Sequence, residues 1–283
     1  MQISVIIPTF NRAHTLWKAV QSVLFQKGTD LEVLIVDDGS SDNTRELIQK
    51  NSFRYKNLRY FYQSNKGPSA ARNLGIKAAQ GNYMAFLDSD DEWLAGKLNA
   101  QLNFFAQRPD YLICQTEEIW IRNGKRVNPM KKHKKLSGFI FDACLRLSII
   151  SSSCAMMRKE FFDEVGFFDE ALPACEDYDL WLRASARFPI GLIEKPYVIK
   201  YGGHPDQLSR RVPVMDQFRV QALHKLLNSN SLSTEQNKLV FSELARKAKI
   251  ISRGAFKRGK TEEAKFYEDL IQELSQLDQT SHL

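Results

Sequence analysis

Three stretches of the sequence share one pattern: ISVIIPTFNR (residues 3–12), LEVLIVDDGS (residues 31–40) and YMAFLDSDDE (residues 83–92). Each begins with a short run of apolar residues and ends in polar or charged ones. A fourth run, Leu58–Gln63, lies between the second and the third. Runs of this length that are rich in β-branched and aromatic residues are typical of buried strands. The pattern therefore predicts four strands in the first third of the chain.

Helical periodicity separates these predicted strands. Leu16 and Val20 fall on one face of the first helical stretch, and a second helix is expected after the capping side chains of Ser41–Asn43. A third helix carries Ala71 and is expected to stop at Gly81. Strands that alternate with helices form parallel βαβ units with right-handed crossovers. The sequence thus predicts an α/β protein.

The middle of the chain is less regular. Short helices and strands alternate there without a fixed spacing, and we expect a polar loop over Asn123–Lys135 and a strand of small residues over Ser151–Met157. No motif for a second substrate can be identified in this part of the sequence. Any such contacts are therefore left open.

The last part of the chain has helical periodicity from Val214 onward. Ser233 and Gln236 have the spacing of a capping box at a helix start. We therefore divide the chain into a domain over residues 1–212 and a C-terminal helical extension over residues 213–283. The apolar faces of that extension pack either against the domain or against a partner.

Composition narrows the class of protein. Of the 283 residues, 43% are hydrophobic and 26% charged, which is ordinary for a globular protein. No apolar run approaches the roughly 20 residues of a membrane span, and no secretory signal is expected at the start of the sequence. Four cysteines occur without a C-x-x-C pair, so we expect reduced thiols in a cytosolic protein rather than a thiolate metal site.

The chain is moderately basic. Its 40 Lys and Arg against 33 Asp and Glu give a net charge of +7, which suits nucleic acid, an anionic membrane or a phosphorylated small molecule. The local clusters Lys131–Lys135 and Arg246–Lys260 are interpreted as solvated surface. Neither has the interleaved aromatic residues of a stacking surface, so we expect no nucleic-acid partner.

Polar residues follow every predicted strand of the first part. The carboxyl ends of parallel strands meet at one edge of the sheet, and ligands bind in the crevice outside that edge. The first two strands lead into Pro8, Thr9, Asn11, Arg12, Asp37 and Asp38, and the next two into Asn65, Gly67, Arg72, Asp88, Ser89 and Asp90. This convergence predicts a ligand site.

The acidic segment Asp88–Glu92 is the most unusual part of that edge. Carboxylates this close together repel one another unless a cation lies among them. Oxygen ligands favour Mg²⁺ or Mn²⁺, which complete their shells with water and phosphate oxygens. The alternative is that these acids only cap a helix. We predict that this segment binds Mg²⁺ or Mn²⁺.

Several other site classes are excluded. No G-x-G-x-x-G follows the first strand, so the dinucleotide-binding pattern fails, and the sequence has no G-x-x-x-x-G-K-[ST] phosphate loop. The few scattered histidines do not assemble a Ser–His–Asp set. The crevice therefore calls for another kind of chemistry.

Four motifs in order resemble the family-2 glycosyltransferases: SVIIPTFNRAHTL from Ser4, VLIVDDGSSDNT from Val33, NKGPSAARNLGIKAAQGNYMAFLDSDD from Asn65 and CEDYDLWLRA from Cys175. The resemblance covers about residues 1–210. It implies the GT-A nucleotide-diphospho-sugar transferase fold, with a mostly parallel central sheet flanked by helices. It also implies a metal-dependent transfer from a nucleotide sugar that inverts the anomeric centre.

The resemblance also implies roles for individual residues. Asp38 would accept the imide hydrogen of a uracil or thymine ring, Asp88 would lie near the ribose, and Asp90 would bind the metal as part of a D-x-D motif. The other residues expected to bind the donor are Pro8, Thr9, Asn11, Arg12, Asp37, Asn65, Gly67, Arg72 and Ser89.

Glu176 and Asp177 match the acidic pair of the family. Glu176 would bind substrate and Asp177 would be the general base, taking the proton of the acceptor hydroxyl. The alternative is a helix cap for the segment that follows. His204 would lie near the diphosphate or the metal, or is only a loop residue.

Two tryptophans and two arginines have weaker assignments. Trp181 is expected in the core. Trp93 either contacts the sugar or acceptor, or only packs. Arg210 and Arg211 are weaker candidates for diphosphate contacts.

The sequence thus predicts a hexosyltransferase-type glycosyltransferase with a UDP-sugar donor, dTDP- and GDP-sugars being the alternatives. The acceptor is a saccharide or a lipid-linked glycan, and the protein is cytoplasmic, either free or peripheral at the inner face of the membrane. Two rivals remain, a sugar-1-phosphate nucleotidyltransferase and a non-catalytic sugar-nucleotide-binding protein. The first lacks its glycine-rich basic loop after strand one, and the intact acids argue against the second.

Overall fold

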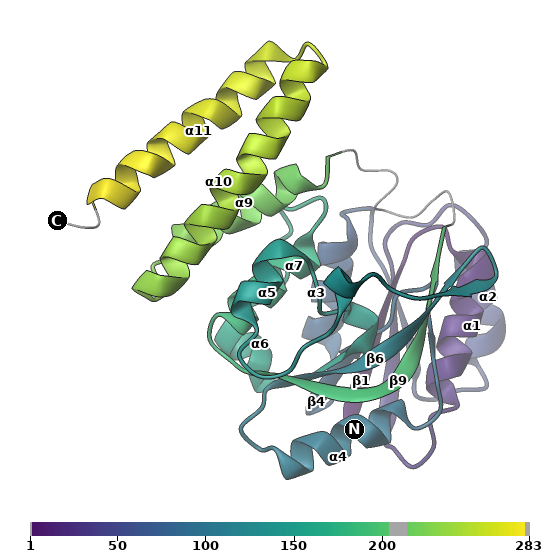
Figure 1. Cartoon of the computed structure of the whole chain (residues 1–283). Helices are drawn as coiled ribbons and strands as arrows, with labels where there is room; N and C mark the ends of the chain where they lie inside the picture. The colour runs from purple at the N-terminus through teal and green to yellow at the C-terminus, as the bar shows by residue number, and fades with distance from the viewer. Residues whose placement is uncertain (1, 204–213, 281–283) are drawn as a thin grey trace.

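A computed structural model describes residues 2–203 and 214–280, and for residues 274–280 it describes the backbone alone. A nine-stranded sheet forms its centre, in the order β3-β2-β1-β4-β8-β6-β9-β5, with β7 paired to β6 (Figure 1). The strands are Ile3–Thr9 (β1), Leu31–Asp37 (β2), Leu58–Tyr62 (β3), Tyr83–Phe86 (β4), Glu92–Trp93 (β5), Ile113–Arg122 (β6), Lys125–Val127 (β7), Ala155–Arg158 (β8) and Ile190–Gly202 (β9).

The predicted parallel pairing of the first strands is confirmed. β1 pairs in parallel with both β2 and β4, and β2 with β3. The sheet then becomes mixed, because β8 runs antiparallel to both of its neighbours, β4 and β6, while β6 and β9 are parallel to each other. Ser151–Met157 is therefore not one strand: a 3₁₀ turn over Ser152–Cys154 precedes β8. The predicted loop over Asn123–Lys135 likewise contains β7 and a 3₁₀ turn at Lys131–His133.

Helices cover both faces of the sheet (Figure 1). Those of the first part follow the strands as predicted. The α-helices are Ala13–Leu24 (α1), Thr44–Ser52 (α2), Pro68–Ala78 (α3), Lys97–Gln107 (α4), Phe141–Arg146 (α5), Glu160–Val165 (α6), Glu176–Ser185 (α7), Asp216–Leu227 (α9), Thr234–Lys257 (α10) and Thr261–Thr280 (α11). Among the described residues, no helix is both long and apolar enough to cross a membrane.

The core consists of two clusters, one on each face of the sheet. Successive side chains of a strand point to opposite faces. Val5 and Ile7 accordingly pack in the cluster that includes side chains of α1 and α4, whereas Ile6 packs in the cluster with α5 and α7. Because both faces are covered, the central strands are continuous apolar runs rather than alternating ones.

Gly81 has a different role from the one predicted. The third helix ends at Ala78, before this glycine. A Cβ atom on Gly81 would lie 2.6 Å from the backbone nitrogen of Ser4, and the Gly81 amide donates to the Ser4 hydroxyl at 2.8 Å. Gly81 is therefore required by its close approach to β1 and not by the end of a helix.

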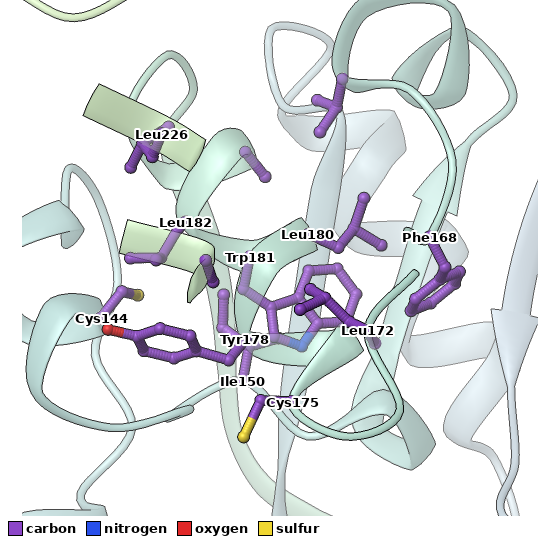
Figure 2. Close-up of a cluster of buried hydrophobic side chains, with 14 of the residues drawn as sticks. Cys144, Ile150, Phe168, Leu172, Cys175, Tyr178, Leu180, Trp181, Leu182 and Leu226 are labelled. Atoms are coloured by element: carbon purple, nitrogen blue, oxygen red, sulfur yellow. The ribbon is translucent and has the colours of Figure 1, made fainter. Parts of the chain in front are cut away.

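Helix α7 links the sheet to the C-terminal helices. Figure 2 shows its Tyr178 and Trp181 within a cluster of buried side chains that also contains Leu226 of α9. Trp181 is 1% exposed, which confirms its predicted place in the core. The cluster extends to α10 through Leu244, so α9 and α10 share one core with the domain that precedes them.

The end of the chain forms a helical hairpin, in which α10 and α11 run side by side (Figure 1). Ser233 and Gln236 form the predicted capping box at the start of α10. Lys247 is an exception to the solvated surface predicted for its cluster: it is 2% exposed, and its ammonium pairs with Asp216 and Glu243 at 3.2 Å each. Glu243 belongs to α10 itself, whereas Asp216 belongs to α9, so the Lys247–Asp216 pair joins the two helices.

Candidate active site

A cavity of about 660 Å³ opens at the carboxyl ends of the parallel strands. It contains the polar residues that the sequence places after β1, β2, β3 and β4, together with the acidic pair at the start of α7. The predicted site residues that line it are Pro8, Thr9, Asn11, Arg12, Asp38, Asn65, Gly67, Arg72, Asp88, Ser89, Asp90, Glu176 and Asp177.

Among the predicted site residues that the structure describes, Asp37 alone does not belong to this lining. Asp37 lies behind the wall, 1% exposed, where its carboxylate accepts from the Ser40 amide at 2.8 Å and the Tyr60 hydroxyl at 2.6 Å. Its position favours support of the turn over contact with a ligand. His204 lies outside the described residues, as do the weaker candidates Arg210 and Arg211.

The turn after β2 is organised by Asp38. One carboxylate oxygen accepts from the Lys66 amide at 2.9 Å and the other from the Gly67 amide at 2.8 Å. Gln63 adds a third bond at 2.7 Å. The next residue, Gly39, has a φ of +83°, and a Cβ there would lie 2.7 Å from the Asn65 amide nitrogen. Only glycine allows the two loops to meet this closely, so Asp38 and Gly39 together fix this wall of the cavity.

The turn after β1 is held in a similar way. Asn11 has a left-handed backbone, with a φ of 53°. Its amide donates to the Ser40 hydroxyl at 2.8 Å, and its side-chain oxygen accepts from the Ser41 amide at 2.8 Å. Asparagine tolerates this conformation better than most residues. The neighbouring Arg12 guanidinium lies 3.6 Å from the Asp90 carboxylate, so the turn reaches the acidic segment after β4.

Arg72 joins the two acidic motifs of the sequence. Its guanidinium donates to Glu176 at 2.7 Å and to Asp88 at 2.9 Å. Asp88 and Glu176 lie 88 positions apart in the sequence, and the arginine that joins them is 7% exposed. The family resemblance assigns Arg72 to donor binding. The structure shows that two of its nitrogens donate to carboxylates of the protein.

The pKa values in this network reflect burial and Arg72 together. Burial alone would lower the pKa of Arg72, but Asp88 and Glu176 outweigh it and raise the pKa above its usual value. Burial raises the pKa of Asp88, but Arg72 and Lys200 together with hydrogen bonds outweigh it, so the pKa is lowered. For Glu176 burial and the nearby Asp177 outweigh Arg72, so the pKa is raised. The opposite directions thus follow from the second charged neighbour, a cation for Asp88 and an anion for Glu176.

The acidic segment after β4 is not uniform. Asp91 is buried against the Ser153 hydroxyl, which donates to it at 2.7 Å, and burial raises the pKa of Asp91 well above its ordinary value. Asp90, by contrast, lines the cavity with a side chain that is 20% exposed. Within the described ranges no group of three or more His, Cys, Asp or Glu side chains is placed to hold a metal ion.

Among the described residues, Asp90 is the predicted metal ligand that lines the cavity. Mg²⁺ often binds with one or two carboxylates, several waters and the phosphates of a substrate. A carboxylate at the mouth of a cavity fits that mode of binding, with water and substrate oxygens as the further ligands.

The acidic pair at the start of α7 follows a strained residue. Cys175 has a φ of 62°, in the left-handed region that non-glycine residues seldom occupy. Its side chain caps no amide of the helix. Asp177 accepts from the Ser148 hydroxyl at 3.0 Å with one oxygen and from the Tyr178 amide at 2.7 Å with the other. The helix-cap interpretation thus accounts for one oxygen of Asp177, and both acids face the cavity.

The other half of the lining was not predicted. Glu118 and Trp120 come from β6, His133 and Lys135 from the segment after β7, and Lys200 from β9. The sequence signal was only the basic run Lys131–Lys135, interpreted as solvated surface. That interpretation is right for Lys131, Lys132 and Lys134, which are exposed, and wrong for Lys135, which is 4% exposed.

Trp93 does not reach the cavity. It is 4% exposed, and its indole nitrogen donates to the Ser153 carbonyl at 2.8 Å. Of its two interpretations, packing is the one that the structure supports.

Comparison with known protein families decides where this site belongs. The family described as glycosyl transferase family 2 matches residues 4–166, more than half of the chain. The chain is a member of glycosyl transferase family 2. The family match ends before Cys175, so the acidic pair of α7 is placed by the structure and by the resemblance of its motif.

Relatives agree with this membership. WfgD of Escherichia coli, a UDP-Glc:α-D-GlcNAc-diphosphoundecaprenol β-1,3-glucosyltransferase, is 39% identical over 184 residues, 64% of this chain and 68% of WfgD. An uncharacterised glycosyltransferase of Rickettsia felis is 36% identical over 194 residues, 69% of this chain. The chain spans about a third of the length of this protein and of its Rickettsia conorii counterpart.

Solved structures agree on the fold. S. aureus TarS 1–349 in complex with UDP-GlcNAc has a TM-score of 0.68 at 18% identity, covering 96% of this chain and 92% of TarS 1–349. The mannosyltransferase PcManGT of Pyrobaculum calidifontis, in complex with GDP-Man and Mn²⁺, has a TM-score of 0.63 at 17% identity, covering 97% of this chain and 84% of PcManGT. The GT-A fold expected of this family-2 member is thereby confirmed.

Proposed function

We propose that the protein transfers a sugar from a UDP-sugar to a hydroxyl of a saccharide or lipid-linked glycan, with inversion and with Asp177 as general base. The observation that carries this proposal is the single cavity that holds both the Asp38 turn and Asp177. The Arg72 bridge from Asp88 to Glu176 ties the donor-side motif to the acidic pair. Membership of family 2 supports the reaction class.

The proposed step for Asp177 is removal of a proton. The acceptor hydroxyl gives its proton to a carboxylate oxygen of Asp177 as its own oxygen bonds to the anomeric carbon. The bond from that carbon to the diphosphate breaks on the opposite face, which inverts the configuration. The Ser148 hydroxyl donates to one oxygen of the carboxylate and the Tyr178 amide to the other, and these two hydrogen bonds fix its orientation.

Asp90 is the residue proposed to meet a divalent cation, Mn²⁺ or Mg²⁺. Such a cation would supply charge compensation for the leaving diphosphate, so that no protein acid is needed there. The mannosyltransferase neighbour was solved with Mn²⁺. If the cation is required, a chelator abolishes donor turnover and added Mn²⁺ restores it. Full activity in excess chelator would contradict this part of the proposal.

UDP is proposed as the donor nucleotide because TarS was solved with UDP-GlcNAc and WfgD is described as using UDP-Glc. The complex of PcManGT with GDP-Man keeps GDP-sugars as the alternative. The acceptor of WfgD is a diphospholipid-linked sugar, which supports a lipid-linked acceptor here. We accordingly propose a cytoplasmic protein that works at the inner face of the membrane.

One surface segment supports that location. Residues 130–139, which we call the strap, pass beside the cavity, and His133 and Lys135 of the strap line it. Met130 and Phe139 are 60% and 80% exposed, and Lys131, Lys132 and Lys134 stand between them on the surface. Exposed lysines mixed with large apolar side chains complement an anionic bilayer surface.

Two opposite variants test the function. Asp177→Asn keeps the size of the side chain but cannot take a proton, so we expect transfer to fall at least ~10²-fold with donor affinity unchanged. Asp38→Ala removes three hydrogen bonds from the donor turn, so we expect weaker donor binding with less effect on turnover at saturation. UDP release from a panel of sugar nucleotides measures both. Transfer by Asp177→Asn within a few-fold of the parent would place the base elsewhere.

A further inference from the structure

Lys135 is a buried charged residue of the cavity wall that lacks a hydrogen-bond partner among the described residues. It is 4% exposed, and within the described part of the chain its ammonium nitrogen has no hydrogen-bond partner. The ammonium forms an ion pair with the Glu118 carboxylate at 3.3 Å. An ammonium group has three protons to donate. Buried polar groups in folded proteins are nearly always hydrogen-bonded, so this group calls for an explanation.

The side chains around Lys135 are fixed by contacts with one another. Glu118 is held in place by the Trp120 indole nitrogen, which donates to it at 2.7 Å, and by the Cys154 thiol at 3.0 Å. The Trp120 ring in turn lies 5.3 Å from the His133 ring. Trp120, His133 and Lys135 therefore form one wall, with an aromatic face beside a cation.

The two lysines at this end of the cavity differ in their surroundings. Burial alone would raise the pKa of Glu118, but Lys135 and Lys200, together with the hydrogen bonds from Cys154 and Trp120, lower it to about 2, so the carboxylate is charged at neutral pH. Lys200 is attracted by Asp91 and Asp88 as well as by Glu118, and it donates to the Ser151 hydroxyl at 3.2 Å. Lys135 has Glu118 as an ion-pair partner but no hydrogen-bond acceptor among the described residues. A negatively charged group in the cavity would supply the acceptor that the Lys135 ammonium lacks.

The position of this wall separates it from the donor residues. In the sheet, β6 is separated from β1 by β4 and β8, whereas the donor motifs follow β1, β2, β3 and β4. Ser148 and Ser151 also line the cavity. Ser148 donates to Asp177, and Lys200 donates to Ser151. The wall is thus continuous with the proposed base and lies across the sheet from the proposed nucleobase contacts.

We propose that Trp120, His133 and Lys135 form a subsite for an acceptor that carries a phosphate or diphosphate group on its sugar. The sugar ring packs against the aromatic face, and the phosphate oxygens accept from the Lys135 ammonium. This inference rests on the proposed function, since it names the acceptor class of the same site. A phosphate group could reach Lys135 from the phosphorylated acceptor sugar or from the diphosphate of the donor, and the test below separates these two sources.

The first arm of the test needs no variant. The protein saturated with UDP is titrated with glucose 1-phosphate and N-acetylglucosamine 1-phosphate, and with the two unphosphorylated sugars. One charge-assisted hydrogen bond predicts at least ~10-fold tighter binding of a phosphorylated sugar. Equal binding of the phosphorylated and plain sugars would overturn the proposal.

The second arm assigns the preference to a residue. Lys135→Met is expected to abolish the preference for the phosphorylated sugar and Lys135→Arg to retain most of it. Lys134→Met, an exposed neighbour on the strap, is the matched control and should behave as the parent. If Lys135→Met keeps the preference, or weakens UDP affinity instead, the ammonium serves the donor diphosphate or the fold, and the proposal is wrong.

This test is independent of the proposed general base. Binding of the phosphorylated sugar to the UDP complex does not require proton transfer. Failure of Asp177→Asn to reduce transfer would therefore leave the subsite standing, and loss of the sugar preference would leave the base assignment standing.

Discussion

The cavity has two halves that differ in how their residues are held. The half that we propose to bind the donor, called the donor half, is built on β1, β2, β3 and β4. Its side chains follow the strands directly and accept from backbone amides of neighbouring turns, as Asp38 does from Lys66 and Gly67. The half that we propose to bind the acceptor, called the acceptor half, is built on β6, β9 and the strap. Its side chains contact one another: Trp120 donates to Glu118, and Lys135 forms an ion pair with Glu118.

This difference explains why only the donor half forms a recognisable motif. A carboxylate that holds a tight turn requires particular residues at fixed spacing within the turn, such as Gly39 beside Asp38. Side chains that meet across a cavity require no spacing in the sequence. They can also change with the substrate without disturbing the backbone. We infer that the donor half is generic and that the acceptor half sets specificity.

The largest effect is expected at Arg72, which joins the donor half to α7. Arg72→Met would leave Glu176 and Asp88 without their buried cation. Breaking a buried ion pair on one side costs about 3–5 kcal/mol, so we expect a loss of that size in the free energy of unfolding and loss of transfer. Urea denaturation followed by circular dichroism measures the first.

The control for that variant is Arg187→Met. Arg187 pairs with Glu164 at 2.7 Å, but both side chains are more than 40% exposed. Exposed pairs contribute roughly 0–1 kcal/mol, so stability should barely change. If Arg72→Met were as mild as this control, the two acidic motifs would not depend on the arginine.

A smaller, pH-dependent effect is expected in the acceptor half. The folded pKa of Glu118 is about 2, below its ordinary value of 4.5. The charged form therefore stabilises the fold above about pH 4.5, by on the order of 3 kcal/mol, and this contribution is lost as the pH falls toward 2. Glu118→Gln should be less stable than the parent at pH 7, and the gap should narrow between pH 5 and pH 3. Urea denaturation at each pH measures both stabilities. A difference between the two proteins that stays constant from pH 5 to pH 3 would contradict the lowered pKa of Glu118.

The smallest effect concerns the outside of the acceptor half. At about 1 kcal/mol for each lysine near an anionic surface, reversing Lys131, Lys132 and Lys134 to Glu should weaken binding to vesicles containing phosphatidylglycerol by about 10²-fold. Co-sedimentation at low salt measures it. The matched control reverses Lys27, Lys56 and Lys159, exposed lysines at the opposite edge of the sheet. Equal loss in both triple variants would mean that net charge, and not the strap, drives binding.

Much of the donor half was predictable. Apolar runs located β1, β2, β3 and β4. The site residues predicted at the ends of these strands line the cavity, except Asp37, which supports the turn from behind. The prediction succeeded because parallel strands bring their carboxyl ends to one edge wherever they lie in the order of the sheet. The individual roles of these residues remain predictions.

The C-terminal extension was predicted as helices but not placed. Periodicity and the capping box of Ser233 locate α10. That α10 buries Leu244 in the same core as Trp181 of α7 depends on long-range packing. The beginning of α9 brings Met215 to the cavity itself, so the extension also contributes to the site.

The sequence by itself determined the parallel half of the sheet, the polar edge outside it and the acidic motifs that lie there, because strand periodicity and turn chemistry act over a few residues. Only the tertiary structure decided that Arg72 binds carboxylates of the protein. The same holds for Lys135, which is buried in the cavity wall although its neighbours in the basic run are exposed, and for Trp93, which packs away from the cavity. Those outcomes depend on burial and on partners distant in the sequence. Local residue patterns do not specify which polar or charged side chain is buried or which distant residue it meets, since both depend on the folded chain.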